Sequence, residues 1–102
     1  MAFDAEVPAH VTQRDILIRA RDQLSVGWCV LSRLDDAGNV CLRGALAKGR
    51  GVHPEMTILG EQDDLARALG FEDECAAMCW NDTQTSVDSV LARFDAAIEK
   101  LG

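Results

Sequence analysis

The chain has 102 residues, of which 48% are hydrophobic, and its 10 Lys and Arg against 17 Asp and Glu give a formal net charge of −7. No apolar run approaches the roughly 18 residues that suggest a membrane span, so we expect no membrane partner. The acidic balance argues against direct nucleic-acid binding, which needs a basic surface to neutralise phosphates. These observations predict a single domain over residues 1–102.

The start of the chain, MAFDAEVPAH, lacks the basic and apolar regions of a secretory signal. We expect residues 1–10 to form a flexible N-terminal arm and the protein to be cytoplasmic. The charge is uneven, because residues 1–51 hold 7 basic and 6 acidic groups (+1) and residues 52–102 hold 3 basic and 11 acidic groups (−8). The sequence therefore predicts a domain with one acidic side.

Four helices are predicted in the chain, at about residues 12–24, 61–69, 73–79 and 86–101. The first begins with Thr12 and Asp15 in the spacing of a capping box, and the last, with Thr85 as its expected N-cap, has the strongest amphipathic pattern. Acidic residues open both middle helices and Gly70 follows the first of them, in the order that the helix dipole and C-cap favour. We expect the first and last helices to supply most of the core.

A β-hairpin is predicted between the first two of these helices. The segment WCVLSRL is rich in residues that favour strands, and it is followed by the turn-forming DDAGN and by VCLR. The strands are expected at about 28–34 and 40–43, in antiparallel pairing. After Gly44 the residues ALAK favour a short helix that Gly49 and Gly51 limit. The predicted fold class is α+β, a mainly helical single domain with one hairpin.

Four cysteines, Cys29, Cys41, Cys75 and Cys79, raise the question of disulfides or a metal site. In the predicted hairpin register Cys29 and Cys41 lie about 13 Å apart along the strands, too far for a disulfide. We favour buried, unmodified thiols without a cofactor. A cysteine-based metal or redox module is the alternative. A third reading, a small cysteine hydrolase, takes Cys29 as nucleophile and His53 as base.

The only basic cluster of the sequence comprises Arg43, Lys48 and Arg50, with His53 close by. The surrounding GALAKGRG is rich in glycine, but it lacks the Lys and Ser or Thr that a phosphate-binding loop has after its last glycine. We predict that these four residues form an interaction surface for an acidic partner or a phosphate, because loops often carry function.

Two tryptophans and their neighbours form a second group of candidate residues. Trp80, Asn81 and Asp82 precede the last helix, where Asn or Asp can accept hydrogen bonds from free main-chain amides. Trp28 stands at the start of the first predicted strand. We interpret these residues, with Cys29 and Cys41, as a structural motif instead of a catalytic one.

The order GWCVLSRLDDAGNVCLRGAL, then WND, then SVLARFDAAIEKL resembles DUF6197, a family of small uncharacterised proteins of actinobacteria and their phages. The resemblance covers about residues 12–101, and Cys75 and Cys79 are not part of the motifs that carry it. It implies a bacterial setting, or a host cytoplasm if the chain is phage-encoded, and it brings no established activity, cofactor or catalytic residue.

Together these observations predict a non-enzymatic, small acidic binding or regulatory protein. Its expected partner is a protein, which would be a host protein if the chain is phage-encoded. No constellation of nucleophile, base and orienting group stands out in the sequence. A homodimer is a further expectation, because a chain of this length buries only a modest core and an exposed apolar stripe can pair two copies.

Overall fold

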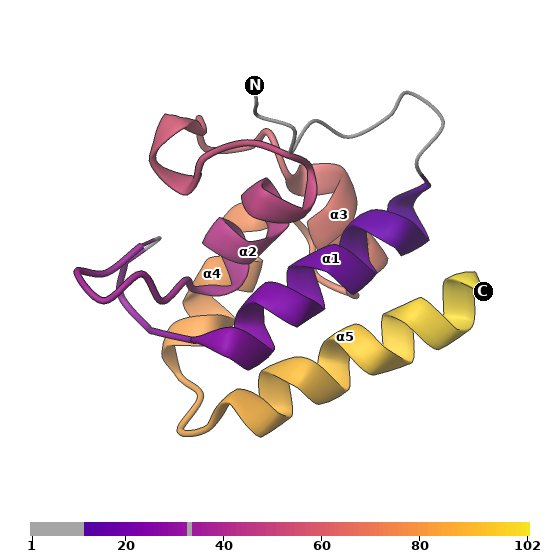
Figure 1. Ribbon diagram of the computed structural model, residues 1–102. Coiled ribbons are helices and arrows are strands. Elements are labelled where there is room, and N and C mark those ends of the chain that lie inside the picture. Colours follow the sequence, from indigo (N-terminus) through magenta and orange to yellow (C-terminus); the bar gives the residue numbers. More distant parts are fainter. Residues whose placement is uncertain (1–11, 33) are drawn as a thin grey trace.

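The computed structural model describes residues 12–32 and 34–102, and this part of the chain is all-α. Its helices are α1 (Gln13–Val26), α2 (Leu42–Gly49), α3 (Asp63–Ala68), α4 (Glu74–Asp82) and α5 (Val87–Leu101), with a 3₁₀ turn, η1 (Pro54–Met56). Helices α1 and α5 lie side by side and run in opposite directions (Figure 1). The N-terminal arm predicted at residues 1–10 lies outside the described residues.

Helix α2 is the centre of the core. Every residue from Leu42 to Ala47 is buried, and so is Gly49. Its sequence, LRGALAKG, has only two charged residues, and a helix that is apolar nearly all round requires neighbours on every side. The core is therefore shared among more helices than α1 and α5. Its largest fully buried apolar side chains are Leu17, Leu24, Leu42, Leu46, Leu65 and Phe94.

The close approach of α1 and α2 depends on Gly49. A Cβ atom built at this position would lie 2.6 Å from the carbonyl oxygen of Ile16 and 3.2 Å from the Cβ of Ala20. Real Cβ atoms do not tolerate the first of these distances, because well-packed interiors leave no room for an additional methyl group. Gly49, which the sequence predicts to limit the helix, is therefore also required for the packing of α1 against α2.

The predicted β-hairpin at 28–34 and 40–43 is wrong, and with it the α+β class. No strand forms in the described residues, where only two isolated bridges join Val40 to Trp28 and to Leu34. Leu31 has a φ of 65°, which turns the chain away from an extended path in the middle of the expected strand. The second expected strand is instead the start of α2, for which Cys41 is the N-cap.

The helix starts follow the capping chemistry of the sequence closely. Thr12 and Asp15 form the capping box of α1, with both reciprocal hydrogen bonds present. Asp73 caps α4 by accepting the amide of Ala76. The N-cap of α5 lies one residue later than expected, because Ser86 and not Thr85 accepts the main-chain amide of Asp88. The predicted helices are thus present, with shifted ends.

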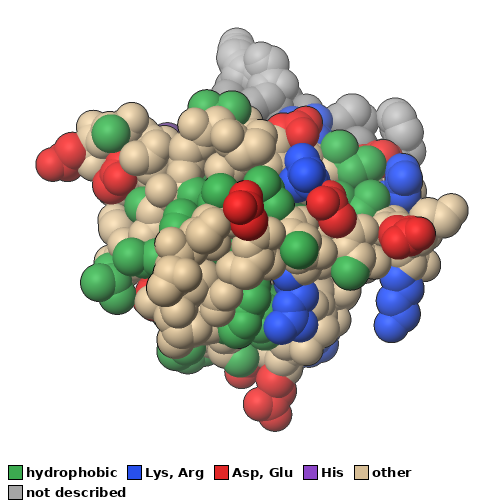
Figure 2. Space-filling view, turned by 90° about the horizontal axis from the view of Figure 1, so that it is seen from below, with side chains coloured by type: hydrophobic (Ala, Val, Ile, Leu, Met, Phe, Trp, Pro, Cys, Tyr) green, Lys and Arg blue, Asp and Glu red, His purple; other side chains and the backbone are tan. Residues whose placement is uncertain are grey.

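The exterior near α5 carries charges of both signs. Figure 2 shows this side with basic and acidic side chains interspersed instead of gathered into a single acidic surface. One ion pair there, between Arg21 and Asp95, links α1 to α5. No helix of the described residues combines the length and apolar character needed to span a membrane.

Candidate functional site

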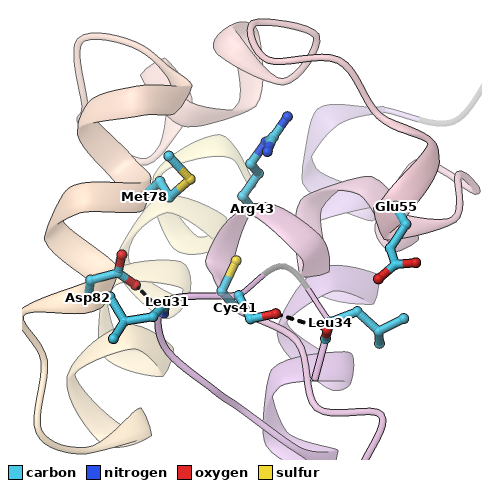
Figure 3. Close-up of a pocket in the computed structure, with 8 residues that line it drawn as sticks. Leu31, Leu34, Cys41, Arg43, Glu55, Met78 and Asp82 are labelled. Atoms are coloured by element: carbon cyan, nitrogen blue, oxygen red, sulfur yellow. Dashed lines mark hydrogen bonds between the residues drawn. The ribbon is translucent and has the colours of Figure 1, made fainter. Parts of the chain in front are cut away.

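A cavity of about 420 Å³ opens where the loop before α2, the turn η1 and the end of α4 meet. Four segments far apart in the sequence contribute to its wall (Figure 3). The lining side chains combine charged and apolar groups, and they are Leu31, Ser32, Leu34, Cys41, Arg43, Glu55, Met78 and Asp82. In the view of Figure 3, Asp82 and Glu55 lie on either side of Cys41 and Arg43.

Arg43 provides the one basic side chain of this wall. It extends from the first turn of α2, and only 9% of its side chain is exposed. Its Nε donates to a carboxylate oxygen of Glu74, whose side chain is fully buried. Arg43 lines the cavity, and neither of its terminal NH₂ groups donates to a described residue.

Glu74 holds this arginine in place through a buried network. Its Oε1 accepts the main-chain amides of Gly60 (3.0 Å) and Gln62 (2.8 Å), while its own amide donates to Asp63 (2.8 Å). The carboxylate therefore joins α2, the loop before α3 and the start of α4. Because the Glu74 carboxylate is itself held by two main-chain amides, it holds the Arg43 guanidinium in one orientation.

Asp82 forms the opposite acidic part of the wall. Its Oδ1 accepts the main-chain amide of Leu31 (2.8 Å) and the side-chain amide of Asn81 (3.3 Å). No described residue donates to Oδ2, which leaves a carboxylate oxygen free for a ligand. The hydrogen bond holds Leu31 in its left-handed conformation, with a side chain that is 80% exposed at the rim. Such strain on a non-glycine residue is typical of functional sites.

Asn81 anchors the loop that carries this rim. It is fully buried, and its Oδ1 accepts the indole N–H of Trp28 (2.8 Å) and the amide of Leu42 (3.2 Å). Its Nδ2 donates to the carbonyl oxygen of Cys29 (3.3 Å). Apart from the bridge in which the Cys29 amide donates to the Val40 carbonyl oxygen (3.0 Å), side chains of α4 hold the segment from Trp28 to Leu31.

The two cysteines near the cavity are not activated. Burial raises the pKa of the Cys41 thiol, and the amides of Gly44 and Arg43 offset this only in part. Burial, with the nearby Cys41 and acidic groups, raises the pKa of Cys29 to about 11. Its thiol donates to the carbonyl oxygens of Ser32 and Asn39. A nucleophilic cysteine needs the opposite shift.

The predicted catalytic pair is Cys29 and His53, and the predicted metal ligands are the four cysteines. His53 lines a different cavity from Cys41, and its Nδ1 accepts the amide of Glu55. All four cysteines are free thiols, with Cys41 buried, Cys29 half-buried, and Cys75 and Cys79 exposed on α4. Among the residues that the structure describes, no three His, Cys, Asp or Glu side chains converge as metal ligands.

The predicted basic interaction surface is divided among three places. Arg43 belongs to the cavity described above, and Arg50 pairs with Asp64 (2.8 Å) and donates to Gln62 (2.9 Å). Only Lys48 and His53 remain together, at a smaller cavity of about 250 Å³. The four residues are adjacent in sequence, but the burial of α2 directs them to different sides.

Trp80 serves neither cavity. Its ring packs against Phe71 with 5.3 Å between centroids, and the guanidinium of Arg93 lies 4.9 Å from the indole centroid. Arg93 also lies 4.4 Å from the Phe71 ring. Trp80 therefore contacts α5 through the cation–π interaction with Arg93, and its tilted ring packs against Phe71 in the segment before α4.

Sequence reasoning missed the residues that complete the cavity, above all Glu74, Met78 and Glu55. Glu74 was interpreted as one of several acidic residues at a helix start. Its position directly after the Asp73 cap was visible, but nothing in the sequence indicated that α2 would bring an arginine to it. Met78 lies one turn before Asp82 on α4, and this spacing was the available signal.

These features define a class: a small protein, all-α in its described residues, whose buried central helix presents an arginine to a polar cavity. A family model covers residues 8–100 of the chain. The chain belongs to DUF6197, a family of unknown function. Neither the curated proteins nor the solved structures contain a match to it.

Proposed function

We propose that this protein is a non-enzymatic binding protein that takes up a basic segment of a partner protein in the cavity between Arg43 and Asp82. One observation carries the proposal: a guanidinium with free NH₂ groups and a carboxylate with a free oxygen line one cavity whose rim is apolar. Concave sites with a few oriented polar groups among apolar ones are the usual form of a binding site.

The charges of the wall favour a cationic guest. Arg43 is already compensated by the buried Glu74, so Asp82 and Glu55 remain as uncompensated carboxylates. A Lys or Arg side chain of the partner would lie against Asp82, and Glu55 on the other side of the cavity would add negative charge. The free NH₂ groups of Arg43 would donate to a main-chain carbonyl of the same segment. The net charge of −7 would speed the encounter with a basic surface.

The apolar rim supplies contacts beside the charges. Leu31 is 80% exposed, and Met56 beside Glu55 is 75% exposed. Leu34 and Met78 line the interior. The stem of a lysine or arginine packs well against such groups, and the flexible thioether of methionine adapts to different guests. A regulatory role through the occupancy of this cavity is consistent with these contacts.

Binding instead of catalysis is supported by the thiols. The raised pKa values of Cys29 and Cys41 leave both side chains protonated near neutral pH. Free thiols also suit a reducing compartment, and for this reason we propose a cytoplasmic location.

The proposal is tested by titrating ¹⁵N-labelled protein with a capped Leu-Lys-Leu tripeptide and, separately, with a capped Leu-Glu-Leu tripeptide. The lysine peptide should shift the amide resonances of Leu31, Cys41 and Asp82, because these residues line the cavity. The glutamate peptide should leave them unchanged. A tripeptide makes few contacts, so millimolar affinity is expected.

Asp82→Asn is the matched variant, since asparagine keeps an acceptor oxygen for the Leu31 amide and removes the charge. It should weaken binding of the lysine peptide, whereas Asp36→Asn, which changes an exposed carboxylate of the 35–39 turn, should not. Equal shifts with both peptides, or equal binding by the Asp82→Asn variant, would refute the proposed charge selection.

A further inference from the structure

Cys75 and Cys79 form a pair of thiols that the cavity does not use. They stand one turn apart on α4, both are free, and both are exposed. The neighbouring Cys79 is the main cause that raises the pKa of the Cys75 thiol, so the two side chains influence one another. Buried cysteines of this protein hydrogen-bond to the main chain, as Cys41 does with the Gly44 amide. Neither Cys75 nor Cys79 caps a helix, because the caps of α4 are Asp73 and Thr83.

The helical spacing is unsuitable for a disulfide. Residues four apart on a helix have Cβ atoms about 5–6 Å apart, whereas a disulfide needs roughly 3.5–4.5 Å. A metal ion between the sulfurs fits better. With metal–sulfur bonds of about 2.3 Å, the two sulfurs of a linear sulfur–metal–sulfur unit lie roughly twice that length apart. This sulfur–sulfur distance is compatible with the Cβ separation of about 5–6 Å across one helical turn.

The donor set selects the kind of ion. Thiolates are soft ligands, and they favour soft cations such as Cu(I). Tetrahedral Zn²⁺ would need further ligands, and the described residues offer no group of three or more His, Cys, Asp or Glu that could hold it. Cu(I) accepts linear coordination by two sulfurs. The carboxylate of Asp73, next to the pair, favours a bound cation.

We infer that Cys75 and Cys79 form a two-thiolate site on the exposed face of α4 for a soft monovalent cation of the Cu(I) type. On binding, each S–H bond loses its proton to solvent and each sulfur gives one bond to the metal, which keeps its oxidation state. The site is independent of the cavity proposed above, because neither cysteine lines it.

The test is a competition for Cu(I) under anaerobic, reducing conditions. Cu(I) bound to a coloured chelator such as bicinchoninate is titrated with the protein, and the loss of absorbance measures transfer. The wild type should remove an equimolar amount of Cu(I). Cys75→Ser and Cys79→Ser should each abolish most of this transfer, because one thiolate alone cannot complete linear coordination.

Cys29→Ser is the control, since it removes a thiol and leaves the pair intact. It should compete like the wild type, and circular dichroism should show that all variants keep their helices. Exposed positions make loss of folding unexpected. No transfer to the wild type, or equal transfer to the Cys75→Ser and Cys79→Ser variants, would overturn the inference.

Discussion

The Oδ1 atom of Asn81 accepts the indole N–H of Trp28 at 2.8 Å, across 53 residues of sequence. The same oxygen accepts the amide of Leu42 at the start of α2. One buried side chain of α4 therefore fixes both the loop that forms the cavity rim and the helix that presents Arg43. Asn81 therefore contributes both to the stability of the fold and to the geometry of the cavity.

Asn81→Ala should lower the free energy of unfolding by at least about 2 kcal/mol, because buried donors left without acceptors each cost roughly 1–3 kcal/mol. Urea denaturation measures the loss. Thr85→Ala, at an exposed position three residues after α4 ends, should stay within about 0.5 kcal/mol of the wild type. An Asn81→Ala variant as stable as the wild type would show that these hydrogen bonds do not hold the loop.

Glu74→Gln should be more damaging, with a loss of about 3–5 kcal/mol, because it leaves Arg43 as an uncompensated buried charge. The same urea titration applies. Glu72→Gln, two residues earlier and exposed, is the matched control, and it should change stability by no more than about 0.5 kcal/mol. Equal stability of the two variants would contradict the buried ion pair.

Gly49→Ala should destabilise the contact between α1 and α2. The added methyl group would meet the Ile16 carbonyl oxygen, and overpacking of this kind costs about 1–3 kcal/mol. Alanine favours helix more than glycine does, so a stabilised variant would show that the helices are further apart than described. Lys48→Ala, at the preceding position, controls for changes to α2 that leave this contact intact.

Cysteine labelling near neutral pH should separate the four thiols. Cys75 and Cys79 are exposed and should react with an aromatic disulfide reagent in the folded protein. Cys29 should react much more slowly, because it is half-buried and its pKa is raised to about 11, and Cys41 is buried. Peptide mapping by mass spectrometry identifies the labelled sites. Rapid labelling of Cys29 would favour the cysteine hydrolase instead.

The helices at the two ends of the described chain were predictable because their signals are local. The capping box at Thr12 and the apolar periodicity of residues 87–101 depend only on neighbouring residues. Residues 28–34 gave a strand signal just as clear, but apart from isolated bridges to Val40 their long-range hydrogen bonds go to Asn81 and Asp82 on α4. Tertiary contacts of that range override local propensity.

The site was harder to predict for the same reason. Arg43 was singled out because it is close in sequence to Lys48 and Arg50, yet its pairing with Glu74 depends on how α2 packs into the core. The sequence predicts that Asp82 accepts amides at the start of the last helix, whereas in the structure it accepts the amide of Leu31 in a distant loop. Its position in a cavity wall could not be inferred without the positions of Met78 and Glu55.

The central claim is that a lysine side chain of a partner enters the cavity between Arg43 and Asp82, and intermolecular nuclear Overhauser effects test it most directly. With methyl-labelled protein and the capped Leu-Lys-Leu peptide, the lysine methylene protons should show contacts to the Met78 methyl group and the Leu34 methyl groups. Contacts to Val52 instead, in the smaller cavity beside Lys48 and His53, would contradict the account.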